Sequence, residues 1–194
     1  MRQSYRPFYV ASISMAPTLM KGEKLVADMR WRTARIGTIV MVQDQSRTIR
    51  IYRIAAIGGQ TFAMKDGVPM IDGHAATQSQ TGTMTIGDTG IDPETGRVMR
   101  EHLPGESGSH QILQLGVYQQ DNVPPVRIPP GSVYLLGDDR DMAADSRIQL
   151  DDLQASNTLV VRADCTYSNT GEGLHRFVDP ADDLNLEAAN ALLK

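Results

Sequence analysis

The chain has 194 residues, of which 41% are apolar and 22% charged, and its formal net charge is −4. This composition supplies enough apolar residues for a core, argues against general disorder and excludes the basic footprint of a nucleic-acid-binding protein. A single cysteine, Cys165, excludes a disulfide within the chain. We expect no metal and no cofactor, because the histidines lack metal-site spacing and are expected on solvated loops: His74, His102, His110 and His175.

The predicted elements are mostly short strands, because 17 glycines and 10 prolines favour turns over a helical bundle. Residues 5–20 are predicted to be extended and to end in a turn at Ala16-Pro17-Thr18. Alternating or β-branched runs predict strands at 36–43, 48–57, 61–64, 67–71, 111–118, 125–128, 132–136 and 157–167.

Two further stretches lack a strand pattern. Residues 75–109 are rich in Thr, Gly, Asp and Gln without clear periodicity, so we expect hairpins and loops inserted into a sheet. Residues 168–178 are predicted to form a linker, and Asp179-Pro180 then opens an amphipathic helix that ends at Leu193. The fold class predicted is mainly β, an antiparallel sheet with an inserted hairpin region and a short C-terminal helix.

Three segments have the residues that catalysis needs. In residues 12–19 (S-I-S-M-A-P-T-L) a serine precedes a turn, which can expose its hydroxyl and aim its N–H at an oxyanion. Residues 51–60 (I-Y-R-I-A-A-I-G-G-Q) form a strand that leads into a glycine turn, and residues 137–147 (G-D-D-R-D-M-A-A-D-S-R) are densely charged. Each segment alone is typical of an ordinary turn, and the third is typical of a solvated one with ion pairs.

Together and in this order, the three segments resemble the bacterial signal peptidase I family of serine–lysine dyad peptidases. Residues 12–19 match its S-x-S-M-x-P-T-L box, residues 52–60 are similar to K-R-V-I-G-L-P-G-D, and residues 137–147 are similar to G-D-N-R-D-N-S-x-D-S-R. Smaller matches lie at 35–40, 64–73 and 161–163. The resemblance implies an antiparallel β fold with a groove for an extended peptide.

The resemblance also implies roles for individual residues. Ser14 would be the nucleophile that attacks the carbonyl after an Ala-x-Ala type site, in signal peptides of exported preproteins. Ser12 would form the oxyanion hole through its hydroxyl, together with the Ser14 N–H. Two ion pairs would shape the site, Arg53 with Asp138 and Asp145 with Arg147.

The sequence departs from the family where the base should be. Tyr52 stands at the position of the dyad lysine, and Ala143 stands where a serine hydroxyl normally holds that lysine. A buried lysine serves as a base because desolvation lowers its pKa, whereas a tyrosine near its reference pKa of ~10 stays protonated at pH 7. Asp139 and Met142 also replace asparagines of the third box. None of the four lysines has the topology to substitute: Lys21, Lys24, Lys65 and Lys194.

These observations leave alternative functions open. The first is a signal peptidase I-type serine endopeptidase, impaired by the loss of its lysine, for which activation by Tyr52 or by a water chain would be required. The second is an inactive homologue that binds extended exported peptides or assists an active paralogue. A self-cleaving repressor-type serine–lysine domain is disfavoured, because residues 137–147 match the peptidase box and no DNA-binding module is evident.

The resemblance covers roughly residues 5–168. It implies a domain over 1–168, with its catalytic parts at about 5–74 and 125–168 and an insertion at about 75–124, followed by a linker and helix at 169–194. It further implies a place at the periplasmic face of the bacterial inner membrane.

No stretch of the chain as given approaches the ~18 apolar residues that a spanning helix needs. We therefore expect an in-frame hydrophobic segment upstream of Met1. Apolar residues beside the serine box are expected either to face lipid or to line the groove: Phe8, Tyr9, Met15, Leu19 and Met20.

Overall fold

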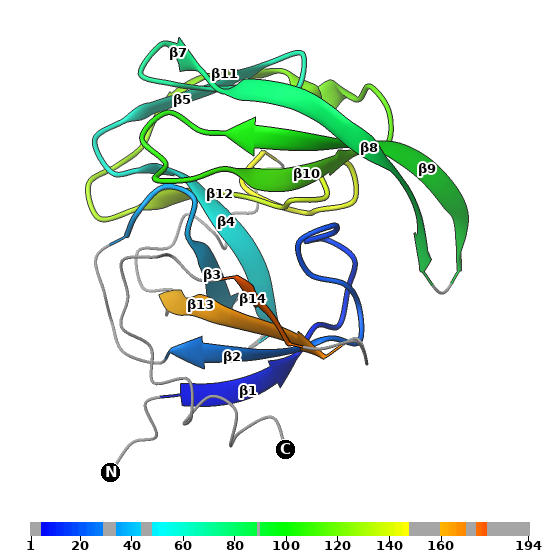
Figure 1. Cartoon of the computed structure of the whole chain (residues 1–194). Helices are drawn as coiled ribbons and strands as arrows, with labels where there is room; N and C mark the ends of the chain where they lie inside the picture. The colour runs from blue at the N-terminus through cyan, green and yellow to red at the C-terminus, as the bar shows by residue number, and fades with distance from the viewer. Residues whose placement is uncertain are drawn as a thin grey trace.

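A computed structural model describes residues 5–28, 34–43, 48–88, 90–147, 160–169 and 174–177. Within this part of the chain, regular structure consists of β-strands and one 3₁₀ helix, Gln119–Asp121. The strands form three sheets, which Figure 1 shows one above the other.

The largest sheet has seven strands in the order β1-β2-β13-β3-β4-β12, and β14 pairs with β13. Its paired neighbours are antiparallel, so that Tyr52 of β4 lies opposite Val40 of β3, and Arg53 lies opposite Leu136 of β12. The strands are β1 (Tyr5–Tyr9), β2 (Lys24–Asp28), β3 (Ile39–Gln43), β4 (Ile49–Ile57), β12 (Val133–Leu136), β13 (Val160–Asn169) and β14 (Leu174–Phe177).

A four-stranded sheet in the order β11-β5-β6-β7 packs on this one. Every second residue of β5 is buried, and its Phe62 ring stacks on the Tyr134 ring of β12 with centroids 3.9 Å apart. Such a stack adds about 0.5–1.5 kcal/mol to the stabilisation that burial provides. The strands are β5 (Thr61–Lys65), β6 (Val68–Ile71), β7 (His74–Ala75) and β11 (Val123–Arg127).

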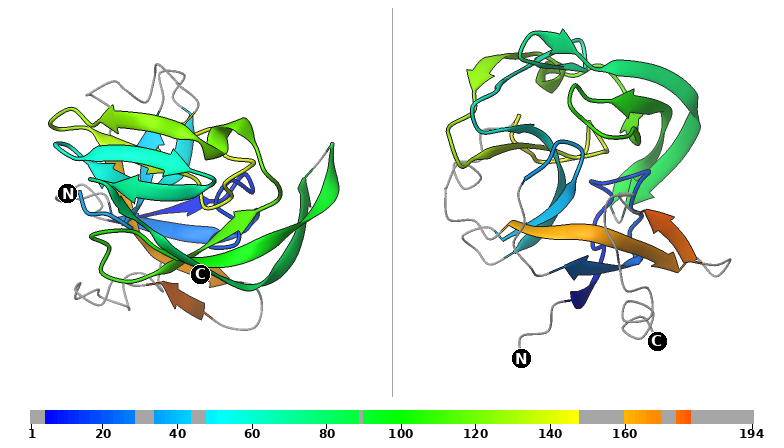
Figure 2. Two further views of the ribbon diagram at one scale, coloured as in Figure 1. Left: turned by 90° about the horizontal axis from the view of Figure 1, so that it is seen from above. Right: turned by 60° about the vertical axis from the view of Figure 1, so that its left-hand side comes forward.

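The third sheet has the order β10-β9-β8 and contains a long hairpin. β8 (Thr77–Asp88) pairs with β9 (Ile91–His102), whereas β10 (His110–Gln114) pairs only with residues 97–101 of β9. Beyond β10 the hairpin therefore continues as a two-stranded arm, which curls toward the N-terminal loop in both views of Figure 2 and in Figure 1. The arm's Ile86 packs in one apolar cluster with Ile13 and Ala16, the residues on either side of Ser14.

The mainly β prediction is confirmed, and most predicted strands agree with observed ones within a few residues. β2 was not predicted, because Leu25, Val26 and Ala27 are all fully buried and show no alternation. The strand predicted at 111–118 is wrong after Gln114, since the backbone N–H groups of Leu115 and Gly116 donate to the Asp141 carboxylate instead of to a strand.

The stretch 75–109 contains β8 and β9, so its hairpin was expected but the length of its strands was not. The three-stranded sheet lies within the predicted insertion at about 75–124, and the domain limits themselves stay a prediction. The predicted linker 168–178 contains β14, which corrects that expectation. The predicted helix at 179–193 lies outside the described residues.

The apolar residues of the serine box divide between core and surface. Met15 and Leu19 are each 1% exposed and pack with Val10 and Leu25, so neither can face lipid or line a groove. Tyr9, in contrast, is 70% exposed. Among the described residues, no helix has the length and apolar character to cross a bilayer.

Candidate active site

The serine box forms the loop between β1 and β2. Hydrogen bonds between the backbones of Val10 and Glu23 and of Gly22 and Val10 close the base of this loop. Its apolar residues Ile13, Met15, Ala16 and Leu19 are buried, which leaves Ser14 partly exposed and Ser12 exposed. Burial of the apolar residues around them thus leaves both serine hydroxyls toward the surface.

The two serines contact each other. The hydroxyl oxygens of Ser12 and Ser14 lie 3.0 Å apart and form a hydrogen bond. In the described part of the chain the Ser14 amide N–H makes no hydrogen bond, so it remains available as a donor. A free N–H beside a second hydroxyl is the arrangement that an oxyanion hole requires.

The loop 137–147 lies directly against the serine turn. The Asp139 N–H donates to the Ser14 carbonyl oxygen at 3.1 Å. A Cβ atom on Gly137 would lie 2.7 Å from the same carbonyl oxygen and 2.1 Å from the Ala143 Cβ. Glycine is required at 137 because both neighbours occupy that space, and the serine box and the third segment are therefore brought together.

Tyr52 is a core residue beside this loop. Its side chain is 2% exposed and packs with Val40, Ile54 and Leu135. Its hydroxyl donates a hydrogen bond of 2.6 Å to the Ala144 carbonyl oxygen. A phenol that donates to a carbonyl holds its proton, so Tyr52 acts as a structural donor in this arrangement.

Ala143, next to the acceptor of that bond, is also buried, with 2% exposure. Its methyl group fills the space beside Gly137 and has no hydroxyl to orient a base. The structure thus brings Ser14, Ala143 and the ring of Tyr52 around one loop.

Arg53, the neighbour of Tyr52 in β4, forms a buried two-bond ion pair with Asp138. Its Nε and Nη2 lie 2.8 and 2.6 Å from the two carboxylate oxygens, and Nη1 donates to the Gly37 carbonyl at 2.6 Å. Burial alone would raise the pKa of Asp138, but the charge and hydrogen bonds of Arg53 outweigh it and lower that pKa. The pair fixes the start of the loop to β4.

Arg147 and Asp145 form a second such pair at the other end of the loop. The Arg147 Nε and Nη2 lie 2.8 Å from the two oxygens of Asp145, and both side chains are fully buried. Asp145 also accepts the Gly137 N–H at 2.9 Å, which ties the two ends of the loop together. The segment 137–147 is therefore held by buried ion pairs and is not the solvated turn that its composition alone would favour.

Asp139 is a carboxylate with little compensation. It is fully buried; Oδ1 accepts the N–H groups of Asp141 and Met142 at 3.2 and 3.1 Å, while Oδ2 has no partner. Burial raises the pKa of Asp139 to about 6. A neutral asparagine amide would occupy this place without the cost of burying a charge. Asparagine is the residue at this position in the signal peptidase I box that residues 137–147 resemble.

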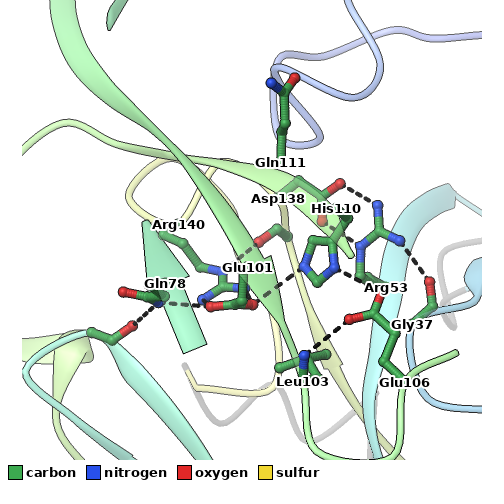
Figure 3. A network of polar contacts seen from close by, with 12 residues as sticks. Gly37, Arg53, Gln78, Glu101, Leu103, Glu106, His110, Gln111, Asp138 and Arg140 are labelled. Carbon is green, nitrogen blue, oxygen red and sulfur yellow. Dashed lines mark hydrogen bonds and ion pairs between the residues drawn. The ribbon is translucent and has the colours of Figure 1, made fainter. Parts of the chain in front are cut away.

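Sequence reasoning missed a group of charged residues behind the loop, drawn in Figure 3. Arg140 forms a buried ion pair with Glu101 of β9, and His110 lies between Glu101 and Glu106. The expectation of solvated loops is wrong for the histidines at 74, 102 and 110: two are exposed but lie in strands, and His110 is buried at the start of β10. The His175 side chain lies outside the described ones.

No sequence pattern distinguished these residues. Glu101 falls in a polar stretch without periodicity, and an isolated histidine is not a signal of burial. In the part of the chain that the structure describes, no three His, Cys, Asp or Glu side chains are grouped to hold a metal ion.

Comparison with known proteins agrees with this geometry. The family model described as "Signal peptidase, peptidase S26" matches residues 3–167. Signal peptidase I of Bacillus licheniformis is 25% identical over 150 residues, which cover 74% of this chain and 66% of that protein. The probable signal peptidase I-1 of a Synechocystis species is 25% identical over 154 residues, which cover 73% of this chain and 61% of the relative.

A shorter match has a different name. A segment of 55 residues is 60% identical to part of an aminopeptidase N from Streptomyces lividans, and it covers 26% of this chain but 6% of that protein. Because the match covers so small a part of the aminopeptidase, it gives no indication of the activity of this chain. The chain spans about two thirds of the length of the signal peptidases, and the family model spans most of this chain. The match to that model, together with a serine turn held against the loop 137–147, shows that the chain belongs to the signal peptidase family of peptidases.

Proposed function

We propose that this domain binds the small-residue, Ala-x-Ala type segment of signal peptides from exported preproteins, and that Ser14 cleaves them slowly or not at all. The single observation that carries the proposal is the hydrogen bond from the Tyr52 hydroxyl to the Ala144 carbonyl. A phenol that donates to a carbonyl keeps its proton, so Tyr52 would not take the proton of Ser14.

The rest of the site supports recognition of a carbonyl group. The Ser14 N–H is available to a developing oxyanion, and the Ser12 hydroxyl could turn to it from its bond with the Ser14 hydroxyl. A donor to an oxyanion contributes roughly 2.7–4 kcal/mol to transition-state stabilisation in a water-poor site. In the described part of the chain the Ser14 hydroxyl bonds to Ser12, and no basic side chain is positioned there to remove its proton. General bases contribute about 10²–10⁴-fold to rates, so we expect a loss of that order relative to a complete dyad.

A second candidate function is peptide binding without turnover. The full burial of Ala143 and Tyr52 favours it, because the pocket for a lysine and its orienting hydroxyl is filled by packed side chains. In that case the domain would hold extended exported peptides or assist an active paralogue. For either function we infer action at the periplasmic face of the inner membrane, where exported preproteins emerge.

The test is cleavage of a preprotein at high enzyme concentration by the wild type, Ser14→Ala and the double variant Tyr52→Lys/Ala143→Ser. We expect slow or undetectable cleavage by the wild type, none by Ser14→Ala, and a rate at least about 100-fold higher in the double variant. Tyr118→Lys, at a tyrosine that is 40% exposed, is the matched control and should change nothing.

Two results would contradict the proposal. Rapid cleavage by the wild type that Ser14→Ala abolishes would show that a base is present. A double variant that binds the peptide but gains no rate would show that Tyr52 does not occupy the base position. Binding of a fluorescent Ala-x-Ala peptide to Ser14→Ala tests the second candidate function. Measurable binding would support peptide binding without turnover, and no binding would contradict it.

A further inference from the structure

Six charged side chains lie buried where β4, β9 and β10 meet the loop 137–147 (Figure 3). Three are cationic when the histidine is protonated, and three are anionic. They are Arg53, Arg140, His110, Asp138, Glu101 and Glu106. The signal peptidase chemistry described above uses none of β9 and β10, so the function of this cluster needs its own explanation.

His110 lies between two carboxylates. Its Nδ1 is 2.9 Å from the Glu106 Oε1, and its Nε2 is 3.2 Å from the Glu101 Oε2, although off the line of an ideal hydrogen bond. The three side chains are at most 6% exposed. A neutral imidazole has one protonated nitrogen, so it would direct the lone pair of the other at a buried carboxylate.

Charge balance favours the same protonation state. With His110 protonated, the six groups carry three positive and three negative charges. Loss of its proton leaves one surplus negative charge in a site that excludes water, where uncompensated charge is costly. The imidazolium therefore completes the cluster.

The cluster is joined to the serine turn by a short chain of contacts. Glu101 holds the Arg140 guanidinium, with Oε1 3.0 Å from Nη1. The backbone N–H of Arg140 donates to the Leu113 carbonyl at 3.0 Å, and the backbone N–H of Leu113 donates to the Asp138 carbonyl at 2.8 Å. From the next residue, the Asp139 N–H reaches the Ser14 carbonyl at 3.1 Å.

A second contact runs parallel to this chain. The Thr18 hydroxyl, four residues after Ser14, donates to the Gln111 carbonyl of β10 at 3.3 Å. β10, the loop and the serine turn thus form one hydrogen-bonded unit, and the charged cluster lies behind it.

We propose that Glu101 and His110 are positioning residues for the Ser14 turn, and that the protonated His110 holds the loop 137–141 against this turn, so that the loop opens locally when the proton is lost. The inference rests on the proposed function only in taking the Ser14 turn as the working site.

The direction of the pH dependence follows from the surroundings. Burial and the charge of Arg53 lower the pKa of His110, but the adjoining carboxylates of Glu101 and Glu106 and the charge of Asp138 outweigh them and raise it. A histidine with a raised pKa in the folded state stabilises that state fully below its ordinary pKa of about 6.5. The stabilisation is lost as the pH rises through the raised value.

Amide hydrogen exchange, followed by NMR between pH 6 and 9, tests this directly without any peptide. We expect the protection factor of the Asp139 amide to fall by about tenfold, which corresponds to about 1.4 kcal/mol in the free energy of local opening. The fall should follow the titration of the His110 ring signal. Amides of β5 should keep their protection, because the proposed opening is local to the loop. A fall at β5 as well would mean that deprotonation of His110 only weakens the whole fold.

Two variants and two controls sharpen the test. His110→Gln should remove the pH dependence of Asp139 protection, whereas His102→Gln, at an exposed histidine of β9, should retain it. Glu106→Gln should shift the midpoint to lower pH, and Glu94→Gln, at an exposed glutamate of β9, should leave it in place.

Constant Asp139 protection across the His110 titration would overturn the proposal, as would an equal effect of His102→Gln. If Glu106→Gln left the midpoint unchanged, the link through the carboxylates would be wrong. These results do not depend on peptide binding or cleavage, so failure of the proposed function would leave them unaffected.

Discussion

The two ends of the loop 137–147 differ sharply from its middle. At the ends, Asp138 and Asp145 are fully buried and each carboxylate is matched by an arginine with two hydrogen bonds. In the middle, Ala143 presents a methyl group and Ala144 receives the Tyr52 hydroxyl. The charged pairs that shape the loop are present at its ends, whereas its middle presents only neutral groups to Tyr52.

This difference shows which charges the fold itself needs. Loss of one partner of a buried ion pair leaves an uncompensated charge and destabilises the fold. Fold stability alone is therefore a sufficient reason for both pairs at the ends of the loop. A lysine in the middle would be a desolvated amine that only catalysis requires. Here Tyr52 supplies a hydrogen-bond donor and Ala143 an apolar contact, and the loop is held in shape without a buried amine at these two positions.

The largest effect is expected from breaking an end of the loop. Arg53→Met leaves the buried Asp138 without its partner, so we expect the free energy of unfolding to fall by about 3–5 kcal/mol in urea denaturation. Arg127→Met, at an exposed arginine of β11, is the control and should change it by less than about 0.5 kcal/mol. Similar losses in both variants would mean that the ion pair does not hold the loop.

A smaller effect of opposite sign is expected at Asp139, the buried acid of the loop without a cationic partner. Burial raises its pKa from 3.8 to about 6, so the folded state loses stability as the pH rises through this interval. Asp139→Asn should therefore stabilise the protein by at most about 3 kcal/mol at pH 8, with a difference that vanishes below about pH 3. Urea denaturation at pH 8 and pH 3 checks this, and an equal gain at pH 3 would point to packing instead of charge.

The smallest effect is expected in the middle of the loop. Tyr52→Phe keeps the ring among its apolar neighbours and removes the hydrogen bond to Ala144, which should lower the free energy of unfolding by about 1 kcal/mol. Thermal unfolding measures the change. A loss as large as that of Arg53→Met would erase the distinction between the ends of the loop and its middle.

The fold class and the composition of the candidate site could be predicted from the sequence, the site by its resemblance to a family. The strands at β5 and β6 follow from alternation, because one of their faces is buried. β8 and the outer part of β9 are mostly exposed on both faces, so alternation gave no sign of their length. The burial of Met15 and Leu19 depends on the closure of the loop between β1 and β2, which no local pattern records.

The environment of the site was less predictable than its members. That Tyr52 donates to Ala144 depends on two segments more than 90 residues apart, and tertiary contacts decide it. His110 is buried because two carboxylates and the loop 137–147 enclose it, whereas its neighbours in the sequence are polar and indicate a surface. Residue identity alone determines neither arrangement.

The packing of Ile86 against Ile13 and Ala16 has a consequence for the order of assembly. The serine turn comes early in the chain, and local contacts close its base, but residues 86–147 make part of the surface that holds it. Its final geometry therefore also depends on contacts of high sequence separation, which form slowly. A growing polypeptide that has emerged only as far as β7 therefore has both serines without the scaffold that orients them. The orientation of both hydroxyls is therefore a property of the completed domain.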